Sequence, residues 1–264
     1  MSSFSAAWLA LREPVDSRAR STRITRAIAD ALPRDRPIDV LDLGAGSGSN
    51  ARYLAEYFRS PQNWLLVDRD AALLDAALKP RVAGITTRVA DLSTIATHAD
   101  LFAGRDLVTA SALLDLVSDD WLRVVVSRCR EAGAAVLFAL SYDGRIACSP
   151  TDPEDEAIRD LVNRHQRTDK GFGPALGPDA AGRASEHLET QGYRVLRDPS
   201  DWVLGSETSD LQSQLIDGWA GAAKEMAPDD TEAIMAWRDR RLAHVLQGRS
   251  HVVVGHEDLA ALIA

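Results

Sequence analysis

Short apolar runs alternate with helix-like apolar spacings along the first half of the chain. Runs of mainly apolar residues predict strands at residues 38–43, 64–67, 107–110 and 134–140, and the same alternation places a third strand at 85–89. Apolar residues spaced for one buried stripe predict helices at residues 24–32, 50–57, 71–78 and 121–129, although the valines of the last would also suit a strand. Strands and helices that alternate at this spacing favour an α/β fold with a doubly wound, mostly parallel sheet.

The alternation is interrupted after residue 142. A polar, helix-like stretch at 154–166 lies between a proline-containing segment, 149–153, and a glycine-rich segment, 170–178. Beyond it the pattern predicts helices at 180–190, 211–226 and 230–246 and strands at 193–196 and 251–254. We therefore expect a single domain, 1–264, whose seven-stranded sheet carries an insertion after the fifth strand. Its parts are a helical cap (1–35), a cofactor-binding core (36–140), the insertion (141–180) and a sheet-completing segment (181–264).

A glycine-rich turn follows the first predicted strand. Gly44, Gly46 and Gly48 stand at alternate positions, where they let the backbone turn tightly and let a ligand approach without meeting a Cβ atom. The nicotinamide-dinucleotide fingerprint needs its third glycine one position later, where this chain has Ser49. Asp42, before the first glycine, would repel a pyrophosphate at the helix N-terminus. The turn therefore favours a ligand that carries an ammonium group and no phosphate.

Two further acids stand at the ends of the next two predicted strands. Asp68 lies 20 residues after Gly48, where a carboxylate is placed to accept hydrogen bonds from a ribose diol, and Asp91 follows the third strand. Asp42 or Asp91 alone would also suit a helix cap or a turn. Because the carboxyl ends of parallel strands meet in one crevice, acids on three successive strands predict one ligand-binding site.

From about residue 36 to 140 the sequence resembles the class I S-adenosylmethionine-dependent methyltransferases, and segment 106–114 is similar to their fourth strand and the loop under the sulfonium. The resemblance implies that Gly44, Ala45 and Gly46 lie against the methionine moiety. It also implies that Asp68 holds the ribose hydroxyls, that Arg69 packs on the adenine and that Asp91 accepts from the adenine amino group. S-adenosyl-L-methionine is thus the implied cofactor. Its implied contacts are Asp42, Gly44, Ala45, Gly46, Gly48, Asn50, Asp68, Arg69, Asp91, Leu92 and Ser111.

No comparable motif identifies the methyl acceptor. The loop after Ser111 lacks the Asn/Asp-Pro-Pro-aromatic signature that similar enzymes use on base or amide nitrogens, which disfavours DNA and glutamine amides. Asp115 stands where many small-molecule methyltransferases of this family carry a residue facing the acceptor, but it would equally suit a cap for the helix near Trp121. Tyr142 lies just past a predicted strand end. Asp115 and Tyr142 are therefore the candidate catalytic residues, as acceptor contacts.

The insertion is the candidate acceptor lid. Long irregular loops in compact domains tend to be functional or disordered, and insertions at this point often cover the acceptor in the family that the sequence resembles. His165, Gln166 and Lys170 are the candidate substrate-binding residues. We also expect the N-terminal segment to fold over the cofactor, with Arg18 or Arg20 pairing with the methionine carboxylate.

The composition of the chain argues against several classes of binding partner. The 264 residues carry a net charge of -9 with an isoelectric point near 5.2, which argues against binding to nucleic-acid phosphates. Cys129 and Cys148 are too isolated for a zinc site or a disulfide framework, so no metal is expected. No apolar run approaches the roughly 20 residues that span a bilayer, and no targeting segment is recognisable. We expect a cytoplasmic protein without a membrane partner and leave its oligomeric state open.

These observations predict methyl transfer to a small molecule, at oxygen or nitrogen. Because the transfer is an in-line displacement, alignment of the reactants supplies much of the rate, and a base is needed only when the acceptor must lose a proton. A catalytically silent S-adenosylmethionine-binding module remains an alternative. A NAD-dependent oxidoreductase is a weaker one, because Asp42 and Ser49 both oppose it.

Overall fold

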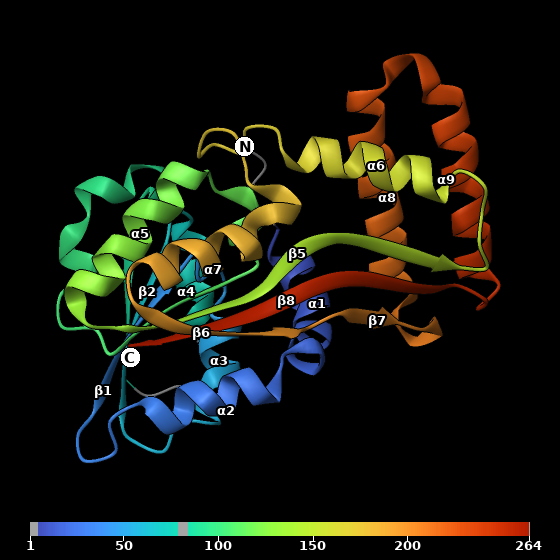
Figure 1. The fold of residues 1–264 in the computed structure, drawn as a ribbon. Coiled ribbons are helices and arrows are strands. Elements are labelled where there is room, and N and C mark those ends of the chain that lie inside the picture. Colours follow the sequence, from blue (N-terminus) through green and yellow to red (C-terminus); the bar gives the residue numbers. More distant parts are fainter. Residues whose placement is uncertain (1–4, 79–83, 264) are drawn as a thin grey trace.

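The computed structural model describes residues 5–78 and 84–263, and within them one sheet forms the centre of the fold (Figure 1). Its strands lie in the order β3-β2-β1-β4-β5-β8-β6, and β7 also pairs with β8. Strands β1 to β5 run parallel, whereas β8 runs antiparallel to β5, β6 and β7. The strands are β1 (Ile38–Leu43), β2 (Gln62–Asp68), β3 (Ile85–Val89), β4 (Leu107–Ser111), β5 (Ala135–Ser149), β6 (Tyr193–Pro199), β7 (Trp202–Leu204) and β8 (His251–Ile263).

The predicted doubly wound, mostly parallel sheet is confirmed, with eight strands in place of seven. The additional strand is β7, which continues the sheet edge after β6 and pairs with the first residues of β8. Three residues are too few to show an alternating pattern in the sequence, so only its pairing with β8 identifies it as a strand.

Helices cover both faces of the sheet. On one face, α2 (Thr22–Ala31), α3 (Ser49–Ala55) and α4 (Ala71–Ala77) share a core with β1 and β2. On the other face, α5 (Asp119–Ala132) and α7 (Ala180–Thr190) pack over β4 and β5, so the valines of α5 belong to a helix (Figure 1). Short 3-10 helices complete the connections: η1 (Leu92–Thr97), η2 (Ala99–Leu101), η3 (Leu114–Leu116), η4 (Gly177–Asp179), η5 (Ser206–Thr208) and η6 (Pro228–Asp230).

A separate helical cluster lies at the far end of the two longest strands. Strand β5 continues past its predicted end at residue 140, and together with β8 it reaches α6 (Asp155–Gln166), α8 (Ser209–Met226) and α9 (Thr231–Leu246) (Figure 1). Helix α6 supplies most of the helical content of the predicted insertion, and it packs against α8 with a shared apolar core. Arg241 of α9 is fully buried and pairs with Asp155 of α6. The insertion is therefore joined to the C-terminal helices.

Helix α1 (Ala6–Ala19) lies across the carboxyl end of the sheet. Its first turn is capped by Ser5, whose hydroxyl accepts from the Trp8 amide at 3.1 Å. Glu13 then makes two hydrogen bonds to the Arg52 guanidinium of α3, at 2.7 and 2.6 Å. This pair fixes α1 beside the glycine-rich turn. None of the helices described in residues 5–78 and 84–263 combines the length and the apolar character needed to cross a membrane.

Candidate functional site

A cavity of about 540 Å³ opens at the carboxyl ends of β1, β2 and β4. This volume falls within the range of about 300–1,000 Å³ that is typical of small-molecule sites. Its wall is formed by helix α1, the end of β1 with the glycine-rich turn, the first turns of α3 and α4, the loops after β2, β3 and β4, and the segment that follows α6. The lining residues include Leu9, Arg12, Asp16, Asp42, Gly44, Ala45, Gly46, Asn50, Asp68, Arg69, Asp91, Leu92, Ser111, Leu113, Leu116, Lys170 and Phe172.

The glycine-rich turn adopts the conformation that its sequence predicts. Gly44, Gly46 and Gly48 have φ angles of 67°, 52° and 80°, a region that side chains rarely allow. A Cβ atom at Gly46 would lie 3.2 Å from Leu9 of α1. The Gly44 amide donates to the Val67 carbonyl at 2.9 Å, which ties the turn to the end of β2. The backbone therefore forms the floor of the cavity.

Asp42 is the most unusual charged group of the site. Its Oδ1 accepts from Asn50 Nδ2 at 2.9 Å, and the same amide nitrogen lies 3.1 Å from the Thr109 hydroxyl. Its Oδ2 is buried without a hydrogen-bond partner among the described residues. Burial raises the pKa of Asp42 to about 7, while the Asn50 hydrogen bond and the nearby Arg20 charge lower it. The carboxyl group is therefore poised to gain a cationic partner.

Arg20 lies behind this carboxyl group. Its Nη1 donates to Asn50 Oδ1 at 2.8 Å and its Nε to Asp258 at 3.3 Å. Its Nη2 is buried without a partner among the residues of the described ranges. Arg18, the other predicted candidate, is exposed, whereas Arg20 is buried behind the cavity wall and reaches it through Asn50; neither arginine lines the cavity. An unpaired acceptor and an unpaired donor thus occur together, at Asp42 and Arg20.

Asp68 and Asp91 are held by backbone amides. Asp68 accepts from the Gly46 amide at 2.8 Å through one oxygen and from the Asp70 amide at 3.0 Å through the other. Asp91 caps η1 by accepting from the Ser93 amide at 2.9 Å, and this bond holds the pKa of its carboxyl group below its usual range. Asp91 therefore serves as a helix cap and also lines the cavity. These hydrogen bonds fix the direction of both carboxylates.

Another part of the cavity wall, which begins at Leu113 beside Gly44 of the glycine-rich turn, is more apolar. Leu113, Leu116 and Phe172 line it, and Phe172 packs edge-on against Trp121 with ring centroids 5.9 Å apart. Two cations lie among them. Arg12 is paired with Asp16 at 2.8 and 3.2 Å and lies over the Trp202 ring, whereas Lys170 projects from the segment after α6.

Comparison with known proteins identifies the fold of this chain. No family model and no curated protein matches the sequence. The solved structure of the cyclopropane synthase MmaA2 from Mycobacterium tuberculosis matches with a TM-score of 0.54 at 10% identity, over 98% of this chain and 94% of that one. The fold is that of the class I methyltransferases.

Two further structures support this assignment of the fold. Phosphoethanolamine N-methyltransferase 2 from Haemonchus contortus, in complex with phosphomonomethylethanolamine and S-adenosylhomocysteine, matches with a TM-score of 0.50 at 16% identity. That match covers 98% of this chain but 58% of the other, so the chain spans little more than half of the nematode enzyme. YcgJ from Bacillus subtilis matches with a TM-score of 0.50 at 14% identity, over 91% and 98% of the two chains.

The cavity brings together most of the residues expected to hold the cofactor. All of them except Gly48 line the cavity; Gly48 instead forms the N-cap of α3, where a Cβ atom would lie 2.9 Å from Ala77. Asp115 lies just behind the wall, 7% exposed, and burial raises its pKa to about 6. It does not cap α5, because Ser118 holds that position and accepts from the Trp121 amide at 3.3 Å.

Three other predicted residues lie outside the cavity wall. The Tyr142 hydroxyl donates to Asn163 Oδ1 at 2.7 Å, on the side of β5 that faces α6. His165 contacts Glu225 of α8 at 3.0 Å and Lys170 at 3.2 Å, and Gln166 ends α6. Of the insertion residues singled out in the sequence, only Lys170 lines the cavity.

Sequence reasoning missed the cavity residues on α1 and on the loop after β4. The N-terminal segment was expected to fold over the cofactor, but its cavity residues were not singled out. Leu9, Arg12 and Asp16 are spaced three and four residues apart, which puts them on one helix face. Leu113 and Leu116 read as ordinary core residues. The helical spacing in α1 was the one signal that could have pointed to its buried face.

Proposed function

We propose that this chain is an S-adenosylmethionine-dependent methyltransferase that acts on a small-molecule acceptor. The observation that carries the proposal is the convergence of Asp42, Asp68 and Asp91 with the glycine-rich turn on a single cavity. Carboxylates at three neighbouring strand ends give a nucleoside with an attached ammonium group more partners than they give a dinucleotide pyrophosphate.

The residues present fit this cofactor. We assign its ammonium group to the oxygen of Asp42 that has no hydrogen-bond partner among the described residues. We assign its carboxylate to Arg20 Nη2, which likewise lacks an acceptor, although Arg20 lies behind the wall and already pairs with Asp258. Asp68 would hold the ribose hydroxyls, and Asp91, with Arg69 and Leu92, the adenine. When bound, S-adenosylmethionine supplies an electrophilic methyl group on its sulfonium. The chain's own residues then orient the acceptor and exclude water.

Acceptor chemistry is assigned to the end of the cavity between Ser111 and Lys170. We assign Asp115 to the acceptor side, where it acts from behind the cavity wall: burial raises the pKa of its carboxyl group to about 6, and its charge acts on Lys170. Tyr142 and Gln166 are retained as acceptor-side residues that act from behind the wall. The acceptor atom would be oxygen or nitrogen.

Thermal-shift measurements test the cofactor. S-adenosylhomocysteine should raise the melting temperature, because a ligand that binds only the folded state stabilises it, whereas NAD should not. Asp68→Ala should remove most of the shift. The exposed Asp75→Ala, on α4, is the matched control and should keep it. A shift with NAD alone would support an oxidoreductase and contradict the proposal.

Transfer is tested separately, by incubating the protein and labelled S-adenosylmethionine with fractionated small molecules. A labelled small-molecule product that fails to form with Asp68→Ala supports methyl transfer. Binding of S-adenosylhomocysteine without any labelled product would point to the catalytically silent module.

A further inference from the structure

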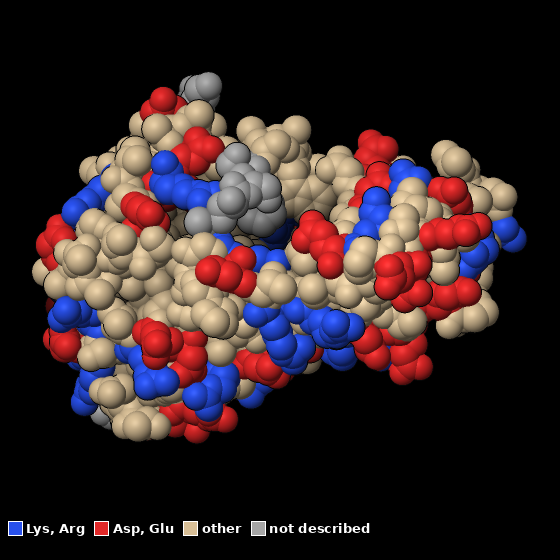
Figure 2. All heavy atoms as spheres, turned by 90° about the horizontal axis from the view of Figure 1, so that it is seen from above, with Lys and Arg blue, Asp and Glu red and all other residues tan. Residues whose placement is uncertain are grey.

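One cation in the cavity wall, Lys170, makes no salt bridge with any carboxylate of the described residues, although Glu225 and Asp115 lie near enough to act on its charge. Arg12, the other cation among the apolar residues of the wall, is neutralised by Asp16 through two hydrogen bonds. The face of the molecule in Figure 2 shows acidic and basic side chains intermixed. Lys170 is therefore singled out by its place in the cavity wall and not by a generally basic surface.

The side chain of Lys170 is also held in place. Its Nζ donates to the Thr168 hydroxyl at 3.0 Å and lies 3.2 Å from His165 Nδ1. His165 Nε2 lies 3.0 Å from Glu225 of α8, so the helical cluster supports the lysine from behind. An ammonium group has three donors, and these two contacts leave one for a ligand.

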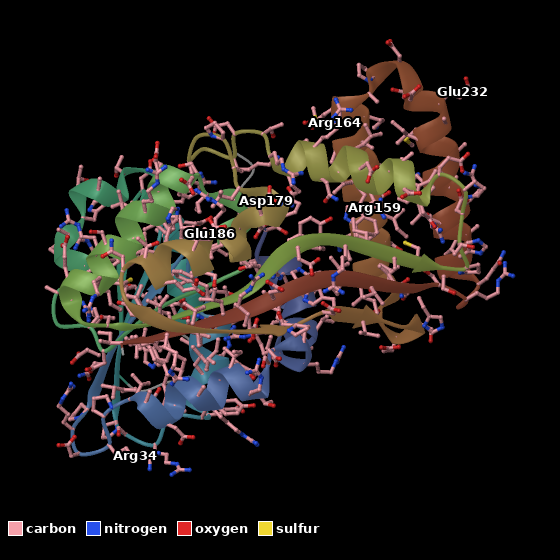
Figure 3. The ribbon with its side chains drawn as sticks, in the orientation of Figure 1. Arg34, Arg159, Arg164, Asp179, Glu186 and Glu232 are labelled. Carbon is pink, nitrogen blue, oxygen red and sulfur yellow. The ribbon has the colours of Figure 1, made fainter. Side chains whose placement is uncertain are left out.

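The neighbouring arginines of α6 cannot take the place of Lys170 in the cavity wall. Arg164 lies on the side of α6 away from β5, whereas Arg159 lies between α6 and β5, and neither lines the cavity (Figure 3). Burial lowers the pKa of Lys170, and the charges of Glu225 and Asp115 act in the opposite direction. A partly buried, pre-positioned cation is an effective anchor for an anion because little side-chain freedom remains to be lost on binding.

We propose that the acceptor carries an anionic group, a carboxylate or a phosphate, that Lys170 binds, and that His165 is the positioning residue for Lys170. The rest of the acceptor is apolar, because Leu113, Leu116 and Phe172 line the same end. The inference rests on the proposed function, since it defines the second substrate of that site.

Two small anions with an apolar ring, benzoate and phenyl phosphate, serve as probes, and benzamide is the neutral control. Their affinities are measured from melting temperatures at constant ionic strength, with and without saturating S-adenosylhomocysteine. Wild-type protein should prefer at least one anion to benzamide. Lys170→Met should bind that anion about tenfold more weakly than the wild type, or weaker still. This is the effect expected when one charge-assisted hydrogen bond is lost. Whichever anion binds more tightly identifies the carboxylate or the phosphate as the recognised group.

The controls separate this inference from the proposed function. Lys224→Met, on α8 and outside the cavity, should bind both anions as the wild type does. Lys170→Met should keep its affinity for S-adenosylhomocysteine. Equal anion affinity in wild type and Lys170→Met, no preference for either anion over benzamide, or a parallel loss of S-adenosylhomocysteine binding would overturn the role of Lys170. If S-adenosylhomocysteine binds no variant, the proposed function fails, while the measurements without it still decide the role of the lysine.

The role of His165 has its own test. His165→Ala should weaken anion binding without changing benzamide binding, and His165→Asn, which keeps a side-chain acceptor, should restore part of it. An unchanged preference for anions in His165→Ala would remove His165 from the inference.

Discussion

Replacing Asp42 by Asn should stabilise the protein increasingly as the pH rises. Asp42 lies fully inside the site with one unpaired oxygen, and burial raises its pKa from 3.8 to about 7. The asparagine keeps the oxygen that accepts from Asn50 and removes the charge. It leaves an amide nitrogen without a partner, but that cost does not depend on pH.

The sign and size of the effect follow from proton linkage. Because the pKa of Asp42 is higher in the folded state, the folded chain binds more protons than the unfolded chain between about pH 4 and pH 7. The contribution of its carboxyl group to stability is therefore fully present below about pH 4 and is lost as the pH rises through about 7. At 1.36 kcal/mol per pKa unit, the penalty grows from about 1.5 kcal/mol at pH 5 to about 4 kcal/mol at pH 8.

The assay is urea unfolding of both proteins without cofactor at pH 5 and pH 8. The unfolding free energy of Asp42→Asn relative to wild type should increase by about 2.5 kcal/mol between the two pH values, or about 5–10 °C in melting temperature. The exposed Asp229→Asn should show no such trend. A difference between Asp42→Asn and wild type that stays constant with pH would refute the argument that Asp42 is buried without a cationic partner. The same variant should bind S-adenosylhomocysteine more weakly.

Three further outcomes are expected. Arg241→Met should lower the unfolding free energy by about 3–5 kcal/mol in urea denaturation, because it leaves the Asp155 carboxylate without its buried partner; a loss below about 1 kcal/mol would contradict this. Gly48→Ala should lower the melting temperature measurably, because a residue with φ of 80° would then carry a Cβ atom against α4, and an unchanged value would argue against that geometry. Glu13→Gln should weaken S-adenosylhomocysteine binding measured by calorimetry, because the ion pair between Glu13 and Arg52 holds α1 over the site. The same change should alter the unfolding free energy by about 1 kcal/mol or less, since the ion pair is partly exposed.

The central strands could be predicted because burial on both faces leaves a clear trace in the sequence. Strand β1 was predicted at its observed bounds, since an apolar run with turn residues on either side defines it. The bounds of β3 were also predicted, although it is the edge strand and is only partly buried, because its threonine and valine residues favour a strand. The second half of β5 could not be predicted. After residue 142 its residues alternate between partly buried and exposed and include Gly144, so the segment reads as a loop. Its hydrogen bonds to β8, far away in sequence, make it a strand.

Tyr142 illustrates the consequence for the site. With the strand expected to end at residue 140, Tyr142 was placed at a strand end that faces the acceptor. In the structure the strand continues, and the tyrosine hydroxyl turns toward Asn163 of α6. Whether it still affects the acceptor stays a prediction.

The sequence by itself determined the cofactor side of the cavity. The glycine-rich turn and the acids Asp42, Asp68 and Asp91 each follow directly from a strand, and parallel strands bring their carboxyl ends to one edge whatever the rest of the chain does. The acceptor side was decided only by tertiary structure. Its wall joins α1, the loop after β4 and the segment around Lys170, which are far apart along the chain and meet only through packing and ion pairs such as that between Glu13 and Arg52. No local pattern records such contacts, because each segment alone is a helix face or a polar loop.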